Sequence, residues 1–129
     1  MRYAETDRMG IVYHAHYVVW FEIGRTEFCR AAGLPYRALE DSGLLILVTG
    51  VTCDYRRPSR YDDLIRIHTV LPALSSRGLR FNYELFGEAG RLASGESRHV
   101  FADRGGRAIH APEDVVNQLN AFRHLAAES

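Results

Sequence analysis

One long apolar helix signal near the N-terminus, spanning residues 12–32, most strongly limits what this chain can fold into. Large and small apolar side chains recur there at the spacing of a single helix face, at Tyr17, Trp20, Phe21, Gly24 and Phe28. Gly33 followed by Leu34-Pro35 is a typical helix end. A glycine on the apolar face lowers helix propensity, so we expect another backbone to approach Gly24 closely. A helix with such a face must bury it against the rest of the chain.

After this helix and a short second helix at 35–41, the spacing of apolar residues changes from that of a helix to every second residue, as in a strand. Strands are predicted at 44–55, 64–71, 79–86 and 92–102, and the apolar, β-branched composition of the first predicts a buried strand. Residues 108–110 could add a short strand, and Pro112 is expected at the N1 position of a last helix. Because helices and strands are segregated along the chain, the fold class is α+β. The simplest arrangement is an antiparallel sheet wrapped around one long central helix.

Length and charge narrow the class of protein. The 129 residues suit a single domain, 1–129. Lys and Arg number 16 against 16 Asp and Glu, so the basic excess typical of nucleic-acid binding is missing. The longest aliphatic run, 44–48, is far shorter than the ~18 residues of a membrane span, and the N-terminus has no apolar signal segment. We therefore expect a cytoplasmic protein without a nucleic-acid partner and without a transmembrane segment. Its two cysteines lack metal spacing and are expected to act as small apolar residues.

The strongest candidates for catalytic residues lie in residues 7–17. Asp7 lies in a turn signal before Gly10, and His14 lies where the long helix begins. The N–H groups at a helix start can polarise a carbonyl or hold an oxyanion, so a carboxylate beside them is half of an acyl-transfer site. Taken singly, Asp7 is most often a turn or cap residue and His14 a polar residue at a helix start. Asp7 with His14 and His16 as metal ligands has no supporting spacing signature.

The sequence resembles the hot-dog-fold acyl-CoA thioesterases, most closely the 4-hydroxybenzoyl-CoA thioesterase and YbgC-like branch. The match is carried by the string Tyr3-Ala-Glu-Thr-Asp7-Arg-Met-Gly10-Ile-Val-Tyr13-His14-Ala-His-Tyr17, then by Trp20-Phe21-Glu22 and Arg25-Thr26-Glu27-Phe28. Further matches along the whole chain are Arg57-Pro58, Tyr61-Asp62-Asp63, Ser75-Ser76-Arg77 and Pro112. The hot-dog fold that the resemblance implies is a sheet wrapped around a central helix, which agrees with the pattern of helices and strands.

The resemblance also implies residue roles. Asp7 matches the catalytic carboxylate, which acts as a nucleophile or as a general base for water. His14 matches the position whose backbone N–H polarises the thioester carbonyl, and Tyr17 and Glu22 match positions that contact the acyl group. Arg77 falls in a stretch that holds CoA phosphates. No metal or redox cofactor is implied, since CoA is part of the substrate.

Some positions differ from the family pattern. A basic cluster at 75–77 is reduced to Arg77, and Arg57, which precedes Pro58 in an extended segment, is our second candidate for CoA binding. Glu22 replaces a shorter acid, which argues against 4-hydroxybenzoyl specificity. Relatives usually begin several residues earlier, so we expect the native start upstream of Met1.

We therefore predict a thioesterase that hydrolyses acyl-CoA to a free acid and CoA. The resemblance implies a homodimer with a continuous sheet, often doubled to a homotetramer, with active sites at the subunit boundary. Two alternatives stay open. A hot-dog hydratase or dehydratase would carry a His-Phe-Pro-Gly-type signature that this sequence lacks, and a non-catalytic acyl-thioester binding protein would hydrolyse no acyl-CoA.

Overall fold

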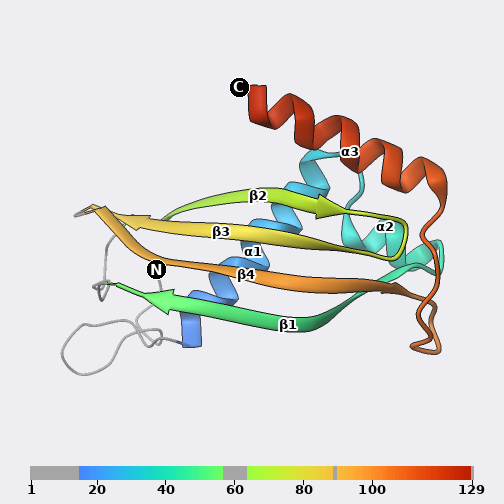
Figure 1. The fold of residues 1–129 in the computed structure, drawn as a ribbon, viewed down its shortest axis with the longest axis horizontal. Coiled ribbons are helices and arrows are strands. Elements are labelled where there is room, and N and C mark those ends of the chain that lie inside the picture. Colours follow the sequence, from blue (N-terminus) through green and yellow to red (C-terminus); the bar gives the residue numbers. More distant parts are fainter. Residues whose placement is uncertain (1–14, 57–63, 89, 129) are drawn as a thin grey trace.

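The computed structural model describes residues 15–56, 64–88 and 90–128, so Asp7, His14 and Arg57 lie outside the described residues. Its elements follow the predicted order of a long helix, a short helix, four strands and a last helix (Figure 1). They are α1 (Ala15–Ala31), α2 (Tyr36–Asp41), β1 (Leu45–Tyr55), β2 (Arg66–Leu74), β3 (Gly78–Gly87), β4 (Gly90–Ala102) and α3 (Glu113–Glu128).

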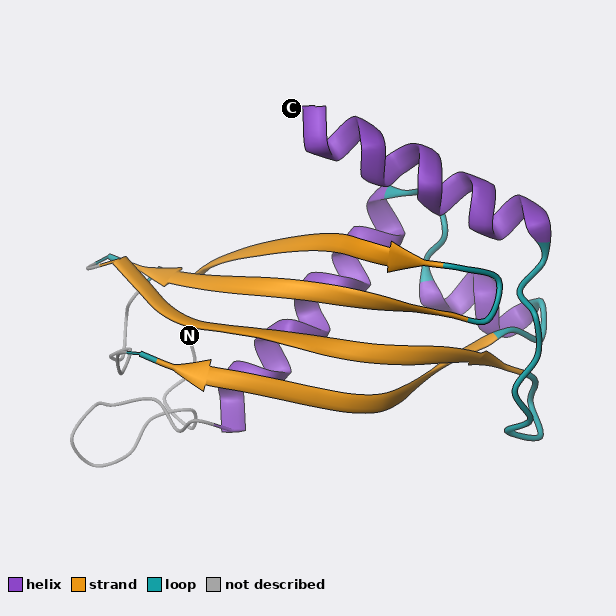
Figure 2. Ribbon diagram, viewed as in Figure 1, coloured by secondary structure: helices purple, strands orange, loops and turns teal. Residues whose placement is uncertain are grey.

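The four described strands form one antiparallel sheet in the order β1-β4-β3-β2. Helix α1 crosses one face of this sheet, and α3 lies beyond the β2 edge (Figure 2). Alternate residues of β3 point to α1 and are buried, as Phe21 stacked on Tyr83 shows, with ring centroids 4.5 Å apart. The α+β class and the sheet wrapped around a central helix are therefore confirmed.

Two glycines let α1 lie close to the sheet. A Cβ on Gly24 would collide with the side chains of Thr69 and Ile67 from β2. The close approach expected at Gly24 is confirmed, but it comes from side chains rather than from another backbone. On the opposite side of the contact, a Cβ on Gly95 of β4 would lie 2.6 Å from the ring of Phe21. Both positions require the absence of a side chain.

Strand β1 differs from its prediction as a buried strand. It is an edge of the described sheet, and Val48, Val51 and Tyr55 leave 48%, 39% and 38% of their surface exposed. Val48 and Val51 pair with the buried residues His99 and Ser97 of β4, so these apolar side chains lie on the α1 face. The prediction was wrong because an apolar, β-branched run reports how apolar a strand is, not whether it has neighbours on both sides.

The last helix begins one residue later than predicted. Pro112 precedes α3, and its carbonyl accepts the N–H of Val116 at 3.3 Å, so Pro112 occupies the N-cap position rather than N1. The predicted strand at 108–110 is reduced to one isolated bridge between Ala102 and Ala108. Phe122 anchors α3 by an edge contact with Phe28, with centroids 5.0 Å apart.

Candidate active site

An aromatic cluster places the beginning of α1 against one end of the sheet. Tyr17 is fully buried, stacks on Trp20 with centroids 5.2 Å apart, and contacts the ring of Tyr55 at 5.2 Å. Tyr55 is the last residue of β1, so the start of α1 lies beside the C-terminal end of that strand. Sequence reasoning singled out Tyr17 but missed Tyr55, because nothing in the local pattern of β1 reports which residue faces α1.

The two predicted acyl contacts lie on different faces of α1. Tyr17 points to the sheet, whereas Glu22 is exposed. Five residues separate them, which corresponds to about 140° around the helix axis. The described part of α1 therefore does not bring Tyr17 and Glu22 together.

The turn between β2 and β3, which contains Arg77, lies at the opposite end of the sheet from the start of α1 (Figure 1). Gly78 follows Arg77 and pairs with Val100, which pairs with Leu47 near the beginning of β1. Leu47 and Tyr55 are eight positions apart on β1, a length of about 26 Å at the usual rise of a strand. One protomer thus keeps the proposed phosphate-binding turn far from the proposed catalytic centre.

The core under α1 contains a polar chain that sequence reasoning did not assign a role. The hydroxyl of Tyr83 bonds to Ser97 Oγ, which lies 2.7 Å from Nε2 of His99. Burial, with a smaller effect from the Arg25 charge, lowers the pKa of His99 to about 4. The imidazole is therefore neutral near pH 7 and closed to solvent, so we interpret this chain as structural. Its sequence signal was the presence of Ser97 and His99 on the apolar face of β4.

Neither cysteine is suited to be a nucleophile. Cys29 and Cys53 are both free. Burial raises the pKa of Cys29 to about 12, and it also raises the pKa of Cys53. Because the thiolate is the reactive form, both thiols are inert near neutral pH. The expectation of a small apolar role is confirmed for Cys29, which is buried, whereas Cys53 is only half-buried.

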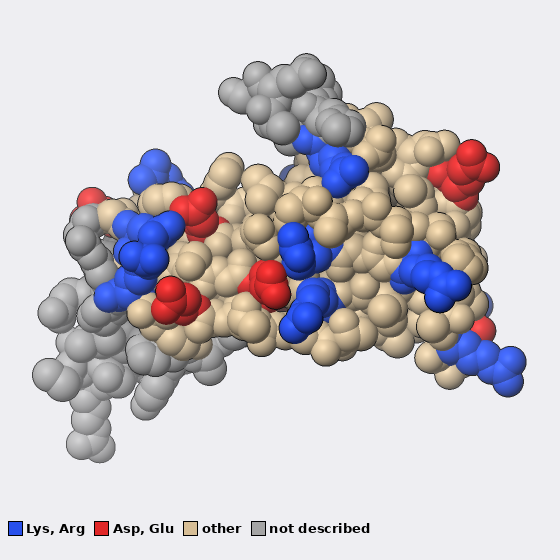
Figure 3. Space-filling view, in the orientation of Figure 1, with Lys and Arg blue, Asp and Glu red and all other residues tan. Residues whose placement is uncertain are grey.

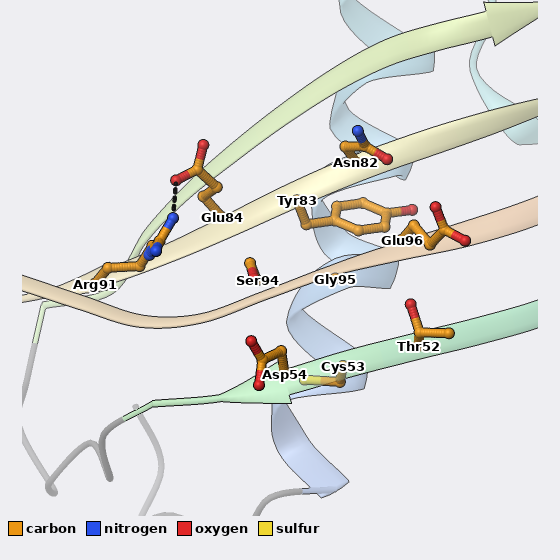
Figure 4. Close-up of a pocket in the computed structure, with 10 residues that line it drawn as sticks. All are labelled: Thr52, Cys53, Asp54, Asn82, Tyr83, Glu84, Arg91, Ser94, Gly95 and Glu96. Carbon is orange, nitrogen blue, oxygen red and sulfur yellow. Dashed lines mark hydrogen bonds and ion pairs between the residues drawn. The ribbon is translucent and has the colours of Figure 1, made fainter.

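The face of the sheet turned away from α1 is polar. Figure 3 shows arginines and carboxylates interspersed across it. A hollow of about 470 Å³ on this face is surrounded by Asp54, Glu84 and Glu96, and Arg91 pairs with Glu84 at 3.2 Å (Figure 4). None of the predicted site residues lines it. Within 15–56, 64–88 and 90–128, His, Cys, Asp and Glu form no group able to hold a metal ion.

A second hollow lies on the other side of the sheet, between α1 and the β2 edge. It measures about 420 Å³ and is mostly apolar, with walls from Ile23, Phe28, Ile67 and Phe122. It begins two turns beyond the start of α1, so it is separate from the aromatic cluster around Tyr17.

Comparison with known proteins gives consistent results. The model of the thioesterase-like superfamily matches residues 1–119. The chain is 36% identical over 105 residues to the putative acyl-CoA thioesterase YneP of Bacillus subtilis, covering 81% of this chain and 76% of that protein. Two solved structures superpose with a TM-score of 0.89. One is the hypothetical protein TT1821 of Thermus thermophilus, at 39% identity over 95% of this chain and 94% of that one. The other is the DHNA-CoA thioesterase of Staphylococcus aureus, at 26% identity over 99% and 89%. In the described part of the chain, no helix is long and apolar enough to cross a membrane.

Proposed function

The chain belongs to the thioesterase-like superfamily and has the hot-dog fold, and we propose that it is an acyl-CoA thioesterase that uses Asp7 and the start of α1. The observation that carries this proposal is the family match, which runs from residue 1 and so includes Asp7 and His14. The name of the relative YneP supports CoA as the thiol part of the substrate.

In the proposed reaction a thioester carbonyl lies at the beginning of α1. The backbone N–H of His14 and its neighbours stabilise the oxygen as it becomes negative, and a single such donor is worth about 3 kcal/mol. Asp7 either takes a proton from the water that attacks the carbonyl, and this proton passes to the leaving CoA sulfur, or it attacks the carbonyl itself. In the second case the CoA thiolate leaves, and water then hydrolyses the acyl–aspartyl anhydride to the free acid and restores Asp7. General-base assistance is worth roughly 10²–10⁴ in rate, so both effects must act on one carbonyl. The chemistry needs no metal or redox cofactor.

We further propose that β1 pairs with β1 of a second copy. An edge strand of 11 residues with exposed apolar side chains is normally covered, and the zero formal net charge adds little repulsion between copies. Pairing of two β1 strands in antiparallel register would bury Val48, Val51 and Tyr55 and continue the sheet through the dimer.

This dimer would bring an arginine to each proposed catalytic centre, although Arg77 of the same subunit lies far from it. Antiparallel pairing places the Tyr55 end of one β1 beside the Leu47 end of the other. The turn with Arg77 lies at the Leu47 end, so the partner's Arg77 comes to the side where α1 of the first protomer begins. Each site would then take Asp7 from one subunit and a phosphate-binding arginine from the other.

Mixed dimers test this arrangement. Asp7→Asn and Arg77→Ala chains, carrying different tags, are co-expressed and the mixed dimer is purified. If the site is shared, the mixed dimer contains one complete site, with the wild-type KM for acyl-CoA and about half of the wild-type kcat per dimer. If Asp7 and Arg77 act within one subunit, no site is complete and the low KM is not recovered. Absence of acyl-CoA hydrolysis by the wild-type protein would overturn the function itself.

A further inference from the structure

Three segments meet at the end of the sheet that carries Arg77. The backbone N–H of Phe101, near the end of β4, donates to the carbonyl of Arg77 at 3.0 Å. Ile109 donates to the carbonyl of Phe101 at 2.9 Å, and Ala111 donates to the carbonyl of Ser76 at 2.7 Å. The chain that leads into α3 therefore runs directly along the β2–β3 turn.

A side-chain bond joins these segments next to Arg77. Ser76 Oγ lies 2.8 Å from Nδ1 of His110, although the two residues are 34 positions apart in the sequence. The rest of the His110 ring is exposed, as is Arg77. The imidazole of His110 is thus bonded to Ser76, the residue that precedes Arg77, and both the imidazole and the arginine are exposed at this end of the sheet.

The charge of Arg77 is available to a ligand. In 15–56, 64–88 and 90–128, the ion pairs of the arginines involve Arg30, Arg80, Arg91 and Arg98. Arg77 joins none of these pairs. Its backbone is also held firmly, because its N–H donates to Ser75 Oγ at 3.2 Å and its carbonyl accepts from β4. The guanidinium therefore extends from a fixed turn and forms no ion pair with a carboxylate of the described residues.

The bond to Ser76 controls which ring nitrogen of His110 carries the proton. When the Ser76 hydroxyl donates to Nδ1, the proton of the neutral ring is on Nε2, the nitrogen that faces away from Ser76. Phosphate oxygens of a dianion only accept hydrogen bonds, so a phosphate at this place selects that tautomer. Arg77 and His110 would then both present donors to one anion, a combination suited to phosphate.

We propose that Arg77 and His110 together bind a phosphate group of CoA, with Ser76 as the residue that positions the imidazole. This inference rests on the proposed function and assigns a ligand role to His110, which sequence reasoning did not consider. The pair lies at the Leu47 end of β1, so in the proposed dimer it serves the site of the other subunit.

Kinetics on a set of substrates tests the assignment. His110→Ala is expected to raise KM for acyl-CoA about 5- to 20-fold and to leave kcat within about 2-fold, because a phosphate far from the thioester contributes the same binding before and during reaction. Ser76→Ala should raise KM less, by about 3-fold, since the ring keeps its N–H but loses its orientation. His110→Gln, which retains a donor, should recover part of the loss.

Truncated substrates separate binding from folding. KM for the acyl-pantetheine, which has no phosphate, should be the same for His110→Ala and wild type. An acyl-dephospho-CoA distinguishes the two phosphate positions: if the His110→Ala defect disappears on it, the 3′-phosphate is the ligand, and if the defect remains, the pyrophosphate is. His68→Ala, which removes an exposed histidine from β2, is the matched control and should change neither constant.

Two results would overturn the inference. An equal rise in KM on acyl-CoA and acyl-pantetheine would mean that His110 only supports the structure, and an unchanged KM on both would mean that it touches no phosphate. Binding of CoA itself, measured by titration calorimetry, separates this inference from the proposed function. If the wild type hydrolysed no acyl-CoA, weaker CoA binding by His110→Ala would still support the phosphate site of Arg77 and His110. Equal CoA binding by the variant and the wild type would reject that site.

Discussion

Tyr17 near the start of α1 and Tyr55 at the end of β1 lie with their ring centroids 5.2 Å apart, and Tyr17 is fully buried between Tyr55 and Trp20. This contact fixes where the helix begins relative to the sheet. Under the proposed mechanism, in which the start of α1 stabilises the oxyanion, this contact also sets the direction of the donor N–H groups.

Removing the Tyr55 ring should therefore affect catalysis more than binding. We expect Tyr55→Ala to lower kcat about 10-fold with a small change in KM for acyl-CoA, because the start of α1 loses a packing partner. Tyr55→Phe keeps the ring and should retain most of kcat. Steady-state kinetics of both variants measure this effect, and their melting temperatures show whether they are folded. Equal kcat for Tyr55→Ala and wild type would contradict a role of the Tyr55 ring in catalysis.

Asp7 should be essential for turnover. Asn has nearly the same shape but lacks a basic oxygen, so Asp7→Asn should lose at least ~10²-fold in kcat while the protein stays folded. Thiol release from an acyl-CoA panel measures the loss, and circular dichroism verifies the fold. Near-wild-type turnover on the best substrate would remove Asp7 from the mechanism.

A methyl group at Gly95 should destabilise the protein. It would press on the Phe21 ring and on the backbone carbonyl of Thr52, so Gly95→Ala should reduce the free energy of unfolding by about 1–3 kcal/mol. Gly50→Ala is the matched control, because its new Cβ would meet only the flexible end of Arg98, at 3.4 Å. Urea unfolding of the two variants should show a clear loss for the first and little change for the second.

Stability should depend on His99 in mildly acidic solution. Burial lowers the pKa of His99 to about 4 in the folded protein, below the unfolded value near 6.5. The unfolded chain then binds the extra proton first, so the contribution of the neutral ring is complete above about pH 6.5 and is lost as the pH falls toward 4. Across that window the wild type should lose more stability than His99→Gln, as chemical unfolding at several pH values can measure. Parallel pH profiles would rule out this role for His99.

Charge on the exposed edge should break the proposed dimer. Val51 lies on the apolar α1 face of β1, so Val51→Lys should give a monomer by light scattering and lower the activity together with the assembly. Thr52→Lys places the same charge on the opposite face of the same strand, beside Glu96, and should leave assembly intact. If Val51→Lys stayed dimeric, another surface would have to hold the two copies together.

The local sequence was sufficient for the elements themselves. The apolar face from Tyr17 to Phe28 predicted α1, and the alternation around Phe81 and Tyr83 predicted β3, because both periods follow directly from backbone geometry. The string around Asp7 and His14 indicated a thioesterase through its resemblance to a known family, and the family match over residues 1–119 confirms that family. Asp7, His14 and Arg57 lie outside the described residues, so their roles stay predictions.

The relations between distant segments depended on the tertiary structure. The sequence by itself shows an apolar β1, but only the strand order made it an edge. The sequence shows Arg77, but only the strand pairing placed its turn at the Leu47 end of the sheet, about 26 Å along β1 from the end that meets α1. The contacts of Tyr17 with Tyr55 and of Ser76 with His110 likewise could not be predicted from the sequence. Periodicity reports which side of an element is apolar. Which elements become neighbours is decided by how all the apolar faces are buried at once, and that depends on the whole chain.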